Sequence, residues 1–242
     1  MEQQQQIPEL TFDHPLLQVI NETCLRPNET IQIHYHDHFE EEEEQEDTHY
    51  EGFLLSLLVD GKTASHIELM FGENDYMELS DMMIISSETQ QGYRQRNYNT
   101  ILRAVLVLLL PSMKIDGKKI KKVVSNAQNH LSVYSLAKLG FVVEGWEGFS
   151  QAFNLSFYTP FQQTNQEQRL IRQGRLKQYI KNRYENKEQE QELHEVSMVL
   201  RKKDYSKSVA LAKVILKRVC GSNCLQQIKK RKYLQQQQQK KK

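Results

Sequence analysis

Apolar and polar residues alternate along the first third of the chain in a way that predicts β-strands. Between Thr30 and Phe39 the polar positions fall between apolar ones, and a period of two predicts a strand with one buried face. The runs Phe53–Val59 and Thr63–Phe71 flank Asp60-Gly61, a dipeptide typical of two-residue hairpin turns. The pattern therefore predicts an antiparallel hairpin, and the apolar stretch Leu79–Ser87 predicts a further strand.

The following segments predict helices that alternate with strands. Thr100–Leu110 is apolar on every side, which is typical of a helix buried between other elements. We expect strands at 120–125, 141–146 and 196–200, and helices at 129–138, 166–191 and 205–219. Antiparallel strands followed by this alternation predict an α+β fold, with a mixed central β-sheet flanked by α-helices.

The same patterns predict one folded domain with polar ends. The predicted parts are a disordered Gln-rich N-terminus at 1–8, a domain at 9–202 with a helical insertion at 148–192, a basic amphipathic C-terminal helix region at 203–233, and a disordered Gln/Lys tail at 234–242.

The formal net charge of +1 hides an asymmetry between the body and the C-terminal end. From Arg201 to Lys242 there are fourteen Lys or Arg residues and one acid, Asp204. The cluster Lys229, Lys230, Arg231 and Lys232 predicts contact with an anionic partner or an import receptor, and solubility alone is the alternative. The acidic stretch Glu40–Asp47 predicts a solvated loop, or a surface that attracts a basic substrate.

The cysteines and the hydropathy favour an intracellular protein. The cysteine count is three, and an odd number without a secretory signal predicts free thiols in a reducing compartment, cytoplasmic or nuclear. The longest apolar run, Ala104–Leu110, is too short to span a bilayer, so no membrane partner is expected.

Three histidines share one face of the first predicted strand: His34, His36 and His38. Imidazole is a common ligand of zinc and copper. Neighbouring side chains on one face of a strand lie about 7 Å apart, which is too far for easy convergence on one ion and favours a solvated polar face. We expect no metal.

A polar turn, Tyr93–Thr100, lies where a predicted strand ends and the buried helix begins. Amides at a helix N-terminus have no internal acceptor, and the helix dipole is positive there, so the position favours a phosphate group. Arg94 and Arg96 add positive charge to this turn.

The order and spacing of these pieces carry a family resemblance. Tyr93 precedes Arg94-x-x-Asn97-x-Asn99 at a helix start, and Asn129-x-x-Ser132 is followed by Leu139-Gly140-Phe141. The segment Met82–Gly145 thereby resembles the acyl-CoA-binding half of the Gcn5-related N-acetyltransferase (GNAT) family. The resemblance implies the GNAT acyl-CoA N-acyltransferase fold, with acetyl-CoA as co-substrate.

The resemblance also implies roles for particular residues. Amides from Gln95 to Thr100 would cradle the pyrophosphate, and the backbone near Met83–Ile85 would pair with the pantetheine arm. The acetyl carbonyl would lie where the strands Leu79–Ser87 and Ile120–Ser125 separate. The residues expected to bind the cofactor are Met83, Ile84, Ile85, Arg94, Gln95, Arg96, Asn97, Tyr98, Asn99, Thr100, Asn129 and Ser132.

The chain departs from the family pattern at the turn and at the expected acid. Asn97 and Asn99 stand where the family has small residues, mainly glycine. Asn tolerates positive φ, so the loop shape is expected to persist with weakened phosphate binding. Leu136 stands where the family often has the Tyr that protonates the thiolate, and Tyr134 should face elsewhere on its helix.

The general base stays open between two carboxylates, Glu78 and Asp81, and the alternative reading is that both are surface charges at a strand start. The predicted function is transfer of an acetyl group from acetyl-CoA to a primary amine of a protein or small molecule by direct attack. One alternative is a non-catalytic scaffold subunit with lost or weakened CoA binding, which would dock a protein partner through 148–192. Another is an RNA-associated protein that acts through Lys229–Lys232.

Overall fold

The computed structural model describes residues 15–40, 48–71, 81–115, 117–127, 130–145 and 196–221. Seven strands form one sheet in the order β1-β2-β3-β4-β7-β9-β8. Their bounds are β1 Glu29–Glu40, β2 Thr48–Val59, β3 Lys62–Phe71, β4 Asp81–Thr89, β7 Lys122–Ala127, β8 Val142–Val143 and β9 Val196–Arg201. The α-helices of these ranges are α1 Pro15–Thr23, α2 Tyr98–Leu109, α3 His130–Ala137 and α6 Tyr205–Cys220.

The sheet is mixed, as the element order predicts. β1 to β4 are antiparallel neighbours, β4 and β7 are parallel, and β9 is antiparallel to both β7 and β8. The parallel pair is joined through α2, which is the connection that parallel strands require. The predicted α+β class with a mixed sheet is therefore confirmed.

The predicted hairpin turn has the backbone conformation that its sequence favours. Asp60 has φ 52° and Gly61 has φ 76°. Positive φ at both central residues is the geometry of the tight turn whose twist matches that of the flanking strands. β2 and β3 therefore pair directly, from Val59 opposite Lys62 onward.

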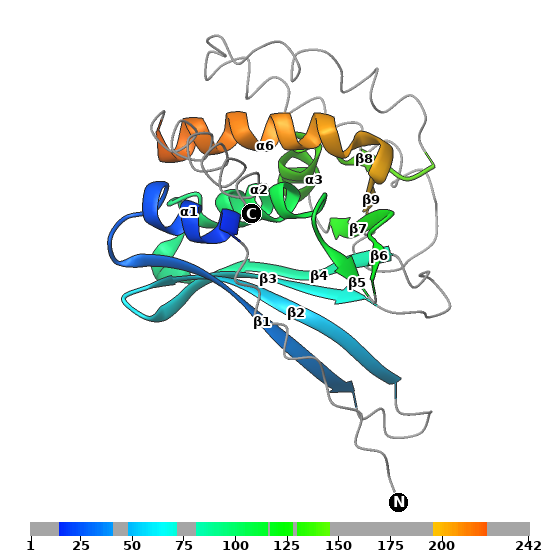
Figure 1. Ribbon diagram of the computed structural model, residues 1–242, viewed down its shortest axis with the longest axis horizontal. Helices are drawn as coiled ribbons and strands as arrows, with labels where there is room; N and C mark the ends of the chain where they lie inside the picture. Colours follow the sequence, from blue (N-terminus) through cyan, green and yellow to red (C-terminus); the bar gives the residue numbers. More distant parts are fainter. Residues whose placement is uncertain are drawn as a thin grey trace, which may run out of the picture.

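Helix α2 lies at the centre of the molecule, between the sheet and α6 (Figure 1). Ten of its twelve residues are buried, in agreement with its apolar sequence. α6 lies over α2 and is amphipathic, as predicted: Ala212 and Leu216 are buried, whereas Lys213 and Lys217 are exposed. The strongly apolar side chains of α2 thus link the sheet to α6 in a single core.

Several elements differ from the sequence-based expectation. Helix α1 and the short strands β5 (Lys114–Ile115) and β6 (Lys118–Lys119) were not predicted. The strand expected at 141–146 is reduced to β8, because it pairs only at Val142 and Val143 with β9. The expected insertion at 148–192, the acidic residues 41–47, the basic cluster 229–232 and both chain ends lie outside the described residues.

None of the helices that the structure describes is both long and apolar enough to cross a bilayer.

Candidate functional site

The parallel strands β4 and β7 separate before either of them ends. Their register stops at Ile84 opposite Ser125, whereas β4 continues to Thr89 and β7 to Ala127. No described strand pairs with the β7-facing edge of β4 beyond Ile84. Met83 and Ile84 take part in the strand pairing, so the free edge begins later along β4 than expected.

A β-bulge in β4 lies at the point of separation. Ile84 pairs with Leu69 of β3, and Ser86 pairs with the preceding residue of β3, Glu68. Ile85 is therefore the extra residue on β4, and it is exposed. A bulge bends its strand and increases the local twist, which accounts for the divergence of β4 from β7.

A cavity of about 340 Å³ occupies the space between the separated strands. Helices α2 and α3 complete its walls. Its lining residues are Met83, Ile84, Ile85, Ser86, Ser87 and Glu88 from β4, Arg103 from α2, Ser125, Asn126 and Ala127 from β7, and Ser132 and Leu136 from α3. The described lining thus combines apolar side chains with several hydroxyl groups, one guanidinium group and one carboxylate.

Arg103 is the one charged side chain of α2, and it is only 8% exposed. Its Nη2 donates a hydrogen bond to the Ser87 Oγ at 3.3 Å, and its Nε has no hydrogen-bond partner. No carboxylate of the described residues forms an ion pair with it. Burial lowers the pKa of the Arg103 guanidinium to about 10, which still leaves it protonated at neutral pH.

Ser87 connects the cavity wall to the start of α2. Its Oγ accepts a hydrogen bond from the Asn99 Nδ2 at 2.6 Å in addition to that from Arg103. Both acceptor positions of the hydroxyl are then used, so its own hydrogen is available to a further acceptor. Asn99, which the sequence places at the phosphate turn, is therefore folded against β4, and its Oδ1 is buried without a partner.

The turn before α2 has two residues with left-handed backbone conformation. Gln95 has φ 70° and Asn97 has φ 63°. Asn97 thus adopts the positive φ expected of it, and its side chain is exposed and makes no capping hydrogen bond. The first hydrogen bond of the helix runs from the Ile101 amide to the Asn97 carbonyl, so the three preceding amides have no acceptor within α2.

The side chains of this turn differ in their surroundings. Arg94 and Arg96 are exposed, and the Arg96 guanidinium lies 5.5 Å from the ring centroid of Tyr93. Tyr98 points inward instead, and its hydroxyl donates to the buried Glu29 Oε1 at 2.6 Å. Burial, and then this hydrogen bond, raise the pKa of Tyr98. Tyr98 therefore anchors the turn to β1. Thr100, the last residue expected to cradle a phosphate, is partly buried at the start of α2.

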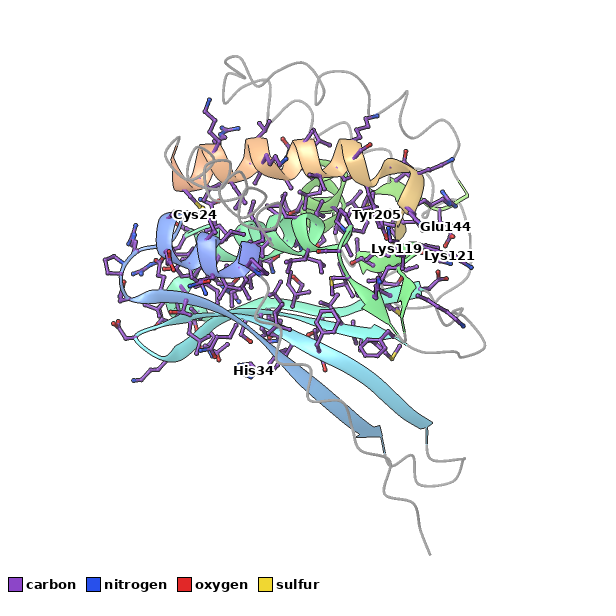
Figure 2. The ribbon with its side chains drawn as sticks, in the orientation of Figure 1. Cys24, His34, Lys119, Lys121, Glu144 and Tyr205 are labelled. Atoms are coloured by element: carbon purple, nitrogen blue, oxygen red, sulfur yellow. The ribbon has the colours of Figure 1, made fainter. Side chains whose placement is uncertain are left out.

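Asp81, one of the two candidate bases, has a structural partner. Its Oδ2 lies 3.2 Å from the Lys122 Nζ, and its side chain is 6% exposed. The two residues pair at the first position of the parallel register, at the other end from the cavity. Its charge also helps to raise the pKa of Tyr205, after burial, and Figure 2 shows Tyr205 at the beginning of α6. The other candidate base, Glu78, lies outside the described residues.

The second motif that resembles the GNAT family, from Asn129 to Phe141, lies only partly within the described residues. Asn129 is outside the described residues, whereas Ser132 and Leu136 line the cavity. Tyr134 is buried with its ring 4.8 Å from the Lys138 Nζ and does not line the cavity, in agreement with its predicted direction. Gly140 has φ 92°, a conformation that favours glycine, and a Cβ there would also collide with the Ser208 Oγ of α6.

The structure describes one of the three histidines considered as metal ligands, His34, and two of the cysteines, Cys24 and Cys220. His34 lies on the face of β1 away from the helices, exposed, with its Nε2 3.0 Å from the Gln32 Oε1 (Figure 2). No group of metal-binding side chains gathers in the parts of the chain that the structure describes. Cys24 is disulfide-bonded, so the expectation of three free thiols is wrong. Cys220 is a free thiol whose pKa burial raises to about 11.

Sequence reasoning missed Ser87, Arg103 and Ser125. A signal for Arg103 was present, because it is the only charge in an otherwise apolar helix, and a charge that must be buried is rarely without a function or a partner. The two serines gave no such signal, since their importance comes from the divergence of β4 and β7. No family model matches the chain, and no curated protein is significantly similar to it.

Proposed function

We propose that the cavity between β4 and β7 binds the pantetheine and acyl part of acetyl-CoA, and that the protein transfers the acetyl group to a primary amine. The observation that carries the proposal is the divergence of two parallel strands around a cavity of about 340 Å³. An extended arm with amide groups fits such a space, because the free edge of β4 offers backbone hydrogen-bonding groups.

The turn before α2 supports the same ligand. Free amides at a helix N-terminus, with Arg94 and Arg96 in the turn, favour a diphosphate. Positive φ at Gln95 and Asn97 keeps a tight turn without the family's glycines. The resemblance to the GNAT family implies the corresponding placement of the diphosphate and of the acyl group.

The chemistry of the proposed reaction needs a base and an acid. The amine would lose a proton as it attacks the thioester, and the thiolate would gain one on leaving. Glu88 is the one carboxylate among the described residues that line the cavity, and it is exposed. Leu136 provides no acid, so water would return the proton to the thiolate.

A second function is favoured by the same residues. A cavity with Leu136 in place of an acid, and with Asn99 folded against β4, also suits a non-catalytic protein that keeps the fold as a scaffold. The two proposals differ in turnover. A protein whose acetyl-CoA binding is weakened or lost, and that acetylates no amine in a broad acceptor screen, is such a scaffold.

The test is thermal unfolding with and without acetyl-CoA. At about a hundred times the dissociation constant, a ligand stabilises the native state by about 2.7 kcal/mol, or about 5–10 °C for a chain of this size. Asn97→Asp, which adds a negative charge beside the expected diphosphate, should reduce the rise. Gln18→Glu, the same charge change at an exposed position of α1, is the control. No rise at millimolar acetyl-CoA would overturn the proposal.

A further inference from the structure

The charge of Arg103 is not balanced by any part of the described structure. Its guanidinium lies in the wall of the cavity, 8% exposed, with one hydrogen bond of 3.3 Å and an Nε without a partner. Transfer of a charge from water into a protein interior is costly unless the charge is paired. Apart from Arg103, α2 is apolar from Ile101 onward, and an apolar residue at position 103 would fill the space without the cost of a buried charge.

Arg103 and Ser87 present hydrogen-bond donors to the cavity, whereas the Asn99 Oδ1, a buried acceptor without a partner, belongs to a side chain outside the described lining. Ser87 has used its acceptor positions on Asn99 and Arg103, and its hydroxyl hydrogen remains to be donated. The Nε of Arg103 is a second donor without an acceptor. A molecule that satisfies this side of the cavity must therefore bring acceptor atoms, and a negatively charged acceptor also balances the guanidinium.

The amount of charge favours a carboxylate over a phosphate. Among the described residues that line the cavity, Arg103 is the only cation; Glu88 lines it too, but its side chain is exposed and forms no ion pair with Arg103. A carboxylate carries one charge, which one guanidinium neutralises in a bidentate arrangement. A phosphate dianion would leave an uncompensated negative charge at a buried position, which is costly.

We infer that the cavity between β4 and β7 holds a carboxylate group against Arg103 and Ser87. This inference rests on the proposed function for its substrates: the carboxylate belongs either to the acyl chain of the CoA thioester, as in a dicarboxylic acyl-CoA, or to the acceptor, as in a free amino acid. Both sources present the same chemistry to the site, and both go beyond simple acetyl transfer to an uncharged amine.

The donor arm of the test compares succinyl-CoA with acetyl-CoA by isothermal titration calorimetry. A carboxylate on the donor predicts that succinyl-CoA binds at least about tenfold more tightly to the wild type, and that Arg103→Met removes this difference while acetyl-CoA binding persists. Arg103→Lys keeps the charge but loses the bidentate fork, so it should recover only part of the preference. Arg201→Met, at an exposed arginine of β9, is the matched control and should keep it.

The acceptor arm compares lysine with lysinamide as acceptors for acetyl-CoA. A carboxylate on the acceptor predicts that kcat/KM for lysine exceeds that for lysinamide by at least about tenfold in the wild type and not in Arg103→Met. If Arg103→Met does not fold, Ser87→Ala removes the second donor and should reduce either preference severalfold. Wild-type ratios near one in both arms, or ratios that Arg103→Met leaves unchanged, overturn the inference and leave the proposed function standing.

Failure of the proposed function gives a different result. If neither thioester binds, succinate alone is the probe: a rise in melting temperature with millimolar succinate in the wild type, absent in Arg103→Met, supports the carboxylate site without CoA. No rise with succinate, in a protein that also binds no thioester, overturns both.

Discussion

Replacement of Arg103 by methionine should make the ligand-free protein more stable. Burial lowers the pKa of Arg103 from 12.5 to about 10, which corresponds to a destabilisation of about 3 kcal/mol. Because Arg103 is a base, its lowered pKa destabilises the folded state fully below about pH 10. This destabilisation decreases only as the pH rises above that value. It therefore applies at neutral pH.

The loss of one hydrogen bond offsets part of this gain. The bond from Arg103 to Ser87 is long, at 3.3 Å, and contributes about 1–1.5 kcal/mol, while Ser87 keeps its bond from Asn99. Methionine fills similar space without a charge, so the net stabilisation should be about 2 kcal/mol. For a chain of this length that is about 4–8 °C in melting temperature.

Urea denaturation followed by circular dichroism measures this change. The buffer should contain no carboxylate or phosphate, because an anion in the cavity would stabilise the wild type. The slope of the free energy of unfolding against urea should stay constant, and Arg201→Met should change stability by less than about 0.5 kcal/mol. If Arg103→Met loses more than about 1 kcal/mol at unchanged slope, Arg103 stabilises the fold, and the reasoning from its unbalanced charge is refuted.

Three further predictions concern the backbone and one ion pair. Gly52→Ala should destabilise the protein by at least about 2 kcal/mol, measured by urea denaturation, because a Cβ there collides with the Leu69 carbonyl of the adjacent strand. Gln95→Gly should raise stability by up to about 1 kcal/mol in the same assay, since Gln95 has φ 70°, and a decrease would show that its side chain has a structural role. Asp81→Asn should lower the free energy of unfolding by about 1–3 kcal/mol, because it leaves the Lys122 charge without its partner. Adding Lys122→Met should restore most of this loss, and additive losses in the double mutant would exclude a coupled pair.

Local patterns predicted the elements whose form depends on neighbouring residues in the sequence. The hairpin at Asp60-Gly61 follows from the positive φ that these two residues tolerate, and the apolar stretch 100–110 is a buried helix because no face of it suits water. The amphipathic period of α6 likewise depends only on spacing. Helix α1 was not predicted, because its sequence carries few of the usual helix signals. It has three buried residues, no acidic residue in its first turn and no basic residue in its last turn.

The candidate site was only partly accessible from the sequence. Asn97 has the positive φ that its residue type tolerates, and Leu136, which stands where the resembled family often has its acid, lines the cavity. Asp81 was a candidate base because it lies at the start of the strand that leads to the turn before α2, where the GNAT family often has a carboxylate. Only the register of β4 with β7 shows that it faces Lys122, away from the cavity.

Local patterns in the sequence predicted the mixed α+β class, the positions of most strands and helices, and a turn before α2. The tertiary structure decided where β4 and β7 separate, which depends on a bulge at Ile85 that no local pattern encodes. It also decided that Arg103, Ser87 and Asn99 meet at one wall of the cavity. The reason is physical: propensity and periodicity act within a few residues, whereas a cavity exists only where segments distant in sequence pack incompletely against each other.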